Sequence, residues 1–187
     1  SAYGNRNFWR MFRDWFGSVN SNSNPVAEFH SMSGYPTVEA GKSVEVYIRY
    51  KNISPYQSYS DMQGVVSGQS PLVLANTNPI NRPSDMMSSG WASSSRPAVN
   101  FSAVYESNGT TLTANQRVAL PGQIYEFKYT YSPALSKPTG VHREWIQPVL
   151  EGAPNWNIGA VGFFDINVTA PESGVVFKRM SGYPTIQ

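Results

Sequence analysis

Hydrophobic and polar residues alternate along several short stretches of the chain. In the stretch GKSVEVYIRYKNIS every second residue from Val44 to Tyr50 is apolar, and residues 122–132 show a similar alternation. A period of two places successive side chains on opposite faces of a β-strand. The pattern predicts strands at 26–32, 41–54, 97–107, 122–132, 140–152, 159–169 and 174–180.

Short strands separated by turn residues predict an all-β fold, an immunoglobulin-like antiparallel β-sandwich with long loops. Residues 55–97 are rich in Ser, Pro, Asn and Gly around one apolar run, PLVLAN, which predicts ordered loops around a single strand. The side chains expected to face inward are Val44, Val46, Ile48, Phe127, Trp145, Val149, Phe163 and Ile166.

The first seventeen residues follow a different period. Aromatic residues recur there at helical spacing with arginines on the opposite face, which predicts a short amphipathic helix at 1–17 and a polar linker at 18–25. Such a helix is marginal alone in water, so its aromatic face needs a surface. We expect a tether or subunit contact, with membrane contact as the alternative. The aromatic residues are Phe8, Phe12, Trp15 and Phe16.

One string occurs twice in the chain. MSGYPT occupies 32–37 and again 180–185, and a Phe stands three residues before each copy, at an offset of 148 (177 − 29). A repeat at this distance predicts one whole domain at 26–171, followed at 172–187 by the first strand of a repeated unit or by an assembly strand. In the second case the strand would complete a neighbouring copy and build a filament. The expected assembly residues in the strings are Phe29, Tyr35, Phe177, Met180 and Tyr183.

Composition narrows the class of protein. Charged residues make up only 14% of the chain, aromatic residues 13%, and there is no cysteine. Low charge with many Tyr, Ser, Thr and Asn residues is typical of extracellular β-proteins, and we expect a location outside the cell or on its surface. A net charge of +2 without a basic run gives no indication of a nucleic-acid partner.

A family resemblance lies in four successive stretches. VEVYIRYKNIS, LPGQIYEFKYTY, PTGVHREWIQPVLEG and IGAVGFFDINV resemble the signatures of the four-tryptophan domain, an immunoglobulin-like domain that also occurs in bacterial extracellular and cell-wall proteins. The resemblance covers roughly residues 44–168 and implies a sandwich fold. The chain departs from the family after KN, where Tyr56 and Tyr59 stand near the position of a family Trp. The residues 71–97 resemble surface-layer-like repeat proteins.

The titratable residues show no pattern of a catalytic site, so we expect the protein not to be an enzyme. His30 and His142 lack metal-ligand spacing, and the chain contains no nucleophile elbow, P-loop or dinucleotide motif. Glu144 and Glu151 are seven residues apart on one predicted strand, so they face opposite sides and do not form a glycosidase pair. We expect no cofactor. Calcium, bound by loop oxygens near Asp61 and Asp85, is an alternative that lacks an EF-hand pattern.

These observations predict a non-catalytic extracellular structural protein, a subunit or tandem module of a surface layer, stalk or pilus-like filament, whose partners are other copies of itself. The alternative is a carbohydrate- or peptide-binding module attached to the cell wall. Loop aromatics would then form its ligand platform, unless they pack over the ends of the sheets. The candidate platform residues are Tyr56, Tyr59, Trp91 and Trp156.

Overall fold

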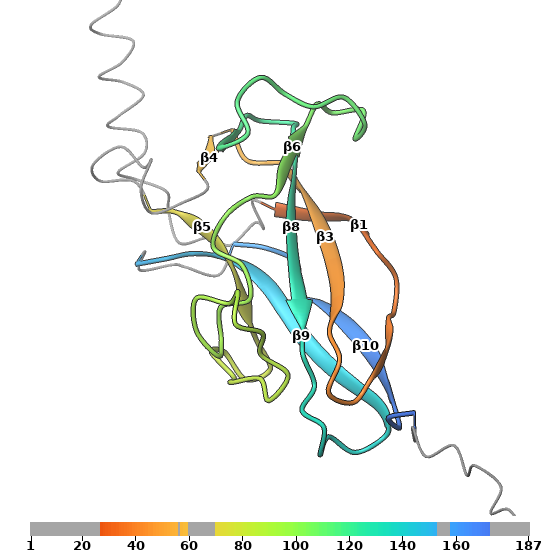
Figure 1. Cartoon of the computed structure of the whole chain (residues 1–187). Coiled ribbons are helices and arrows are strands. Elements are labelled where there is room, and N and C mark those ends of the chain that lie inside the picture. The colour runs from red at the N-terminus through yellow and green to blue at the C-terminus, as the bar shows by residue number, and fades with distance from the viewer. Residues whose placement is uncertain (1–26, 56, 60–69, 153–157, 173–187) are drawn as a thin grey trace, which may run out of the picture.

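The computed structural model describes residues 27–55, 57–59, 70–152 and 158–172. The predicted N-terminal helix, the linker and the second copy of the repeated string lie outside these ranges. Within them the chain is all-β and contains no helix, so the all-β prediction is confirmed. Figure 1 shows two groups of long strands lying across one another, with loops at both ends.

The first sheet contains four antiparallel strands in the order β1-β3-β8-β6. The second contains four strands in the order β2-β10-β9-β5, in which β2 pairs with β10 in parallel and the other pairs are antiparallel. The strands of the first sheet are β1 (Ala27–Met32), β3 (Val44–Asn52), β6 (Ala103–Tyr105) and β8 (Ile124–Tyr131). Those of the second are β2 (Thr37–Glu39), β5 (Leu72–Asn76), β9 (Gly140–Leu150) and β10 (Gly162–Thr169). A small separate pair joins β4 (Ser58–Tyr59) to β7 (Val118–Ala119).

The two sheets share one hydrophobic core. Side chains of β3 and β8 meet side chains of β5, β9 and β10 in a single buried cluster. The rings of Tyr129 and Tyr131 each contact the ring of Phe164 edge to face at 6.2 Å. Burial of this apolar surface between the layers is the main term that stabilises the fold.

Of the eight residues predicted to face inward, five are buried, one is partly buried against the core and two are half-buried away from it. Val46, Ile48, Phe127 and Ile166 are buried in the core between the sheets, whereas Val149 is buried in a separate small cluster. Val44 is partly buried against the core. The prediction is wrong for Trp145 and Phe163, which are both half-buried and pack on each other edge to face at 5.1 Å.

The reason for this error is the alternation of β9. Trp145 has the buried Glu144 and Ile146 on either side, so the strand turns the glutamate inward and the indole outward. A carboxylate tolerates this position because Arg82, which comes from the loop after β5, forms an ion pair with it.

Loops occupy much of the region between β5 and β6, as the composition predicts. Within the apolar run PLVLAN, the residues LVLAN form β5, and every residue of β5 is buried. The predicted strand at 97–107 is confirmed only for its last part, β6, while Ala98 makes an isolated bridge to Leu74. Periodicity did not reveal β2, β4 and β7, because two or three residues are too few to show a period.

Candidate functional site

The first copy of the repeated string connects the two sheets. Its Phe29 and Met32 lie on β1, the edge strand that pairs with β3, and its Thr37 begins β2, which pairs with β10. The string therefore contains the crossover by which one edge strand leaves the first sheet and joins the second (Figure 1).

Hydrogen bonds attach both ends of this crossover to the sheets, and a glycine lies between them. The Ser33 amide donates to the Tyr47 carbonyl at 3.0 Å, and the Ser33 hydroxyl accepts from the Tyr47 amide at 3.2 Å. Gly34 has a φ of +89°, a left-handed conformation that favours glycine. The Pro36 carbonyl then accepts a hydrogen bond from the Asn167 amide at 2.9 Å.

Phe29 and Tyr35, which the sequence predicts to be assembly residues, are both exposed at this edge. Phe29 is 43% exposed and contacts the ring of Tyr50, and Tyr35 is 58% exposed and stacks on Phe163 at 5.7 Å. The remaining predicted assembly residues, Phe8, Phe12, Trp15, Phe16, Phe177, Met180 and Tyr183, lie outside the described residues.

The segment through this string runs in the same direction as the last strand. Ala27 bridges Gly159 in parallel, and the parallel β2–β10 ladder continues to Glu39 opposite Thr169. The described chain therefore begins at one end of the module and leaves β10 at the opposite end. The eight residues of β10 alone correspond to roughly 25 Å of extended chain.

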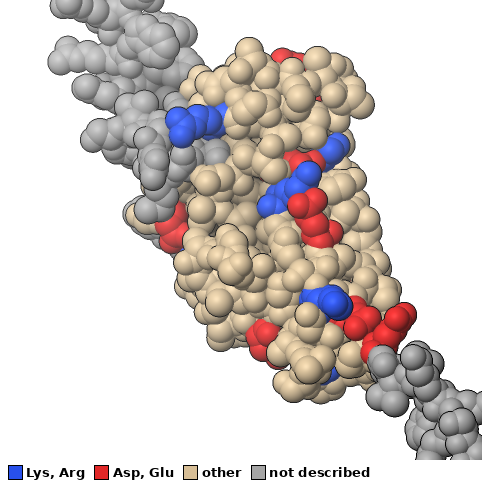
Figure 2. Space-filling model, in the orientation of Figure 1, with Lys and Arg blue, Asp and Glu red and all other residues tan. Residues whose placement is uncertain are grey.

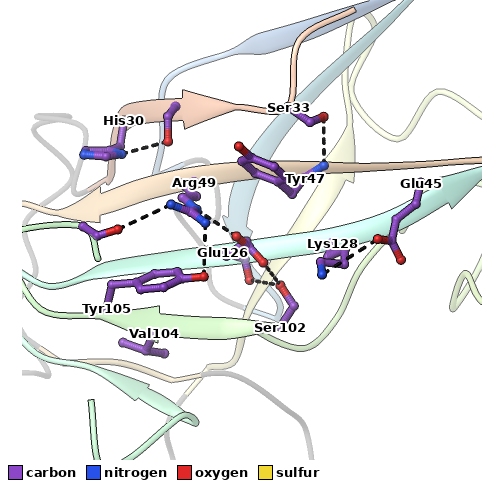
Figure 3. A network of polar contacts seen from close by, with 12 residues as sticks. His30, Ser33, Glu45, Tyr47, Arg49, Ser102, Val104, Tyr105, Glu126 and Lys128 are labelled. Carbon is purple, nitrogen blue, oxygen red and sulfur yellow. Dashed lines mark hydrogen bonds and ion pairs between the residues drawn. The ribbon is translucent and has the colours of Figure 1, made fainter. Parts of the chain in front are cut away.

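A polar network covers the outer face of the first sheet (Figure 3). The Arg49 guanidinium donates to the Glu126 carboxylate at 2.7 Å and to the Tyr105 hydroxyl at 3.1 Å, and it stacks over the rings of Tyr47 and Tyr105. The Ser102 hydroxyl donates to the same carboxylate at 2.8 Å. Burial alone would lower the pKa of Arg49, but the hydrogen bond and charge of Glu126 outweigh it and raise this pKa.

A second arginine cluster lies on the outer face of the second sheet. Arg143 on β9 and Asp165 on β10 are paired across the strands, and the guanidinium donates two hydrogen bonds to the carboxylate, at 2.7 and 2.8 Å. The same guanidinium lies 3.9 Å from the ring centroid of Phe163 and 5.4 Å from that of Trp145. The hydrogen bond from Arg143 holds the pKa of Asp165 below its ordinary value. We call the residues Tyr35, Arg143, Trp145, Phe163 and Asp165 the open face.

The carboxylates predicted to be separate are separate. Glu144 forms an ion pair with Arg82, and Glu151 accepts two hydrogen bonds from Arg96, at 2.7 and 3.3 Å. A polar cavity of about 480 Å³ lies beside the first of these pairs and is also lined by Asp85, which forms an ion pair with Lys137. Among the described residues no group of three or more His, Cys, Asp or Glu side chains could hold a metal ion.

The aromatic residues proposed as a ligand platform do not form one in the described part. Trp91 is 8% exposed, its indole N–H donates to the Thr130 carbonyl at 2.7 Å, and its ring packs edge to face on Tyr129 and Tyr131. This packing over the sheets matches the alternative interpretation. Tyr56 and Trp156 lie outside the described residues, and so does the side chain of Tyr59.

Sequence reasoning missed the open face. Its residues come from three places in the chain and meet only through the β9–β10 register and the crossover. One signal was present in the sequence, because Arg143 with Trp145 and Phe163 with Asp165 are pairs spaced by two residues, which share a face of a strand.

Comparisons with known proteins give only distant likenesses in fold. No family model and no curated protein matches the chain. One similar structure is AvmM, which catalyses macrocyclization in alchivemycin A biosynthesis, at 10% identity over 81% of this chain and 94% of that one, with a TM-score of 0.41. Another is a β-glucosidase from Listeria innocua, at 16% identity over 80% of this chain and 17% of that one, with a TM-score of 0.36.

A third similar structure is the seventh ScaB type I cohesin from Pseudobacteroides cellulosolvens, at 15% identity over 78% of this chain and 92% of that one, with a TM-score of 0.29. Likenesses at these scores say nothing about what the chain does. In the residues that the structure describes, no helix is long and apolar enough to span a membrane.

Proposed function

We propose that the two sheets form an immunoglobulin-like sandwich. In a constant-type immunoglobulin domain, strands A, B, E and D make one sheet and C, F and G the other. If β1, β3, β5, β6, β8, β9 and β10 are labelled A to G in chain order, the two sheets contain the same two sets. In this scheme β2 is a continuation of strand A that pairs with strand G. The resemblance to the four-tryptophan domain implies the same architecture.

We infer that the chain is a non-catalytic extracellular building block in which such modules follow one another in tandem. The observation that carries this proposal is the set of contacts that the first copy of the string makes with the strands after it. Its contacts go to Tyr47, Phe163 and Asn167, all of which follow it within the same module. A second copy of the string would need a second set of these partners, and a further module after it would supply them.

The direction of the chain supports an end-to-end array. Because β1 begins at Ala27 and the last strand, β10, ends at Thr169 at the far end, a following module would extend away from the first one. Modules joined in this way form a stalk or an element of a surface layer.

A strand-swapped filament is the less favoured form of assembly. The edge of β3 that a donated strand would need is already paired with β1 over Ala27–Met32. A donated second copy would have to displace a strand that is tethered to the same sheet and therefore present at a high effective concentration.

The proposal that the module is not an enzyme rests on the pairing of its charges. The buried carboxylates of Glu126 and Glu144 each have an arginine partner that holds them in place. On the face shown in Figure 2, positive and negative residues lie beside each other rather than gathering by sign. The proposed extracellular location rests on the low charge together with the many Tyr, Ser, Thr and Asn residues.

A two-module chain tests the array. Residues 38–172 are fused directly after Thr185, so that the second copy of the string precedes a second set of β2 to β10. We expect both modules to fold, with about twice the unfolding enthalpy of one module, since this enthalpy scales with the number of folded residues. Small-angle scattering should show an elongated particle.

The matched control is Gly182→Val in the two-module chain. Gly182 corresponds to Gly34, whose φ of +89° a β-branched residue adopts only at a cost. This variant should destabilise the second module and leave the first unchanged. If the second module stays unfolded without any substitution, or if the string variant has no effect on it, the array proposal is wrong.

A further inference from the structure

We propose that the open face binds a neutral glycan. Tyr35 lies at its rim, 58% exposed, with its ring stacked on Phe163 at an interplanar angle of 19°. One side of the tyrosine ring is thus covered by Phe163. Aromatic rings present a flat apolar surface to which the C–H groups of a sugar ring can pack.

The polar groups beside these rings can hydrogen-bond to sugar hydroxyls. A guanidinium carries five N–H donors, and the pair with Asp165 uses two of those of Arg143. Each Asp165 oxygen accepts one of these bonds and keeps a further lone pair. Adjacent hydroxyls on one sugar can therefore accept from the arginine and donate to the aspartate. Asn167, also exposed and next on the same face of β10, extends this set.

The charge of the open face favours a neutral ligand. Arg143 and Asp165 cancel each other, so the face offers no net attraction to a charged polymer. A protein partner would have to cover this ion pair and remove its water, which is costly, and the centres of protein interfaces are depleted in charged residues. A glycan leaves the pair hydrated and replaces only some of its water with hydroxyls.

The position of Tyr35 has a consequence for valency. Tyr35 belongs to the repeated string, and Tyr183 holds the same place in the second copy. If modules follow in tandem as proposed above, the platform recurs once per module, and weak single-site binding adds up to avidity. Only this consequence depends on the array. The single site is tested on the chain as it exists.

The experiment uses an array of immobilised glycans that carries neutral β- and α-linked glucans, mannans and xylans together with charged polymers such as polygalacturonate and heparin. We expect the chain to bind at least one neutral class. Tyr35→Ala should weaken that binding roughly tenfold, about the value of one lost aromatic contact, and Tyr35→Phe should retain most of it. Tryptophan fluorescence should change on binding in the parent chain and not in a Trp145→Phe variant.

The matched control is Leu112→Ala, which removes another exposed apolar side chain, away from the open face. Its glycan binding should equal that of the parent chain, and circular dichroism should show all variants folded. Binding to charged polymers only, binding that survives Tyr35→Ala, or no binding to any neutral glycan would overturn the proposal. Self-association that Tyr35→Ala abolishes, in place of glycan binding, would assign the face to a protein contact instead. Failure here leaves the two-module experiment unaffected.

Discussion

The outer faces of the two sheets each carry an arginine that contacts aromatic rings and a carboxylate, but the two clusters differ in burial. Arg49 on the first sheet and Arg143 on the second each stack on two aromatic rings and donate to a carboxylate across a strand pair. Their carboxylates differ. The side chain of Glu126 is 4% exposed and also accepts from Ser102, whereas that of Asp165 is 21% exposed and accepts two hydrogen bonds from Arg143.

Burial therefore decides what each cluster can do. The Arg49 guanidinium donates to Glu126, to Tyr105 on β6 and to the Gly109 carbonyl from the segment after β6, so its hydrogen bonds bind it to three other parts of the chain (Figure 3). Removing one partner of such a buried ion pair is costly, because the other charge is left buried without compensation. The open face keeps donors and acceptors in contact with water, where a ligand can use them.

The largest expected effect is alkaline unfolding, which depends on the four buried tyrosines of the core. Burial raises the pKa of Tyr50, Tyr125, Tyr129 and Tyr131 far above the ordinary value. In the unfolded chain these phenols ionise near pH 10, so above that pH the unfolded state has released protons that the folded state retains. Stability should fall by about 1.4 kcal/mol per tyrosine for each pH unit above roughly 10.

Four such residues would exhaust a typical folding free energy within about two to three pH units. Tyrosinate absorbance and circular dichroism should therefore change together in a single alkaline transition. Ionisation of all 11 tyrosines while the sheets remain folded would show that the interior is open.

Removing the arginine of the Arg49–Glu126 pair should have the next largest effect. Arg49→Met leaves the buried Glu126 carboxylate without its cation, and we expect a loss of about 3 kcal/mol in unfolding free energy. Denaturant titration measures the loss. The double variant Arg49→Met/Glu126→Leu removes both charges and should recover most of it, and an equally large loss there would contradict this account.

Adding one methyl group to Gly34, in the crossover that brings Tyr35 to the open face, should lower the stability of the fold. A Cβ at Gly34 would meet no atom within 4 Å, so the cost of Gly34→Ala comes from its φ of +89° alone and should be about 1–2 kcal/mol. Gly90→Ala is the control, because Gly90 also has open space and no positive φ. If Gly34→Ala and Gly90→Ala lose the same unfolding free energy, the positive φ of Gly34 does not require glycine and this prediction is wrong.

The smallest expected effect on stability comes from the Arg143–Asp165 pair of the open face. Asp165 has a lowered pKa in the folded state, so the stability it contributes is present above the ordinary carboxyl pKa and is lost as the pH falls through the lowered value. Because the pair is exposed, Arg143→Met should leave the thermal midpoint at neutral pH within error of the parent. NMR titration should show the pKa of Asp165 rising in that variant. An unchanged pKa would mean that the pair does not form in solution.

The sequence predicts the strands better than it predicts their faces. The alternation in β3 and β8 places Val46, Ile48 and Phe127 inward, and the structure agrees. In β9 the prediction that Trp145 faces the core is wrong, because Glu144 takes the inward position. The partner that makes the opposite face possible, Arg82, is 62 residues away from Glu144, and no local pattern contains that information.

The candidate sites show the same limit. The repeated string could be found from letters alone, but its role as the crossover between sheets depends on the parallel pairing of β2 with β10. The open face depends on the register that sets Arg143 opposite Asp165, 22 residues apart in the chain. Long-range pairing of this kind is fixed by the whole core rather than by neighbouring residues.

The parallel pairing of β2 with β10 has a mechanical consequence. In an array, tension would enter the module at the start of β1 and leave it at the end of β10, so it would pull these strands in opposite directions along their length. The hydrogen bonds of the β1–β3 and β2–β10 ladders would then be loaded together in shear instead of opening one after another. Resistance to a steady pull depends on how fast a module unfolds under force, not on its equilibrium stability. The short edge strand that carries the repeated string would act as a clamp against stretching.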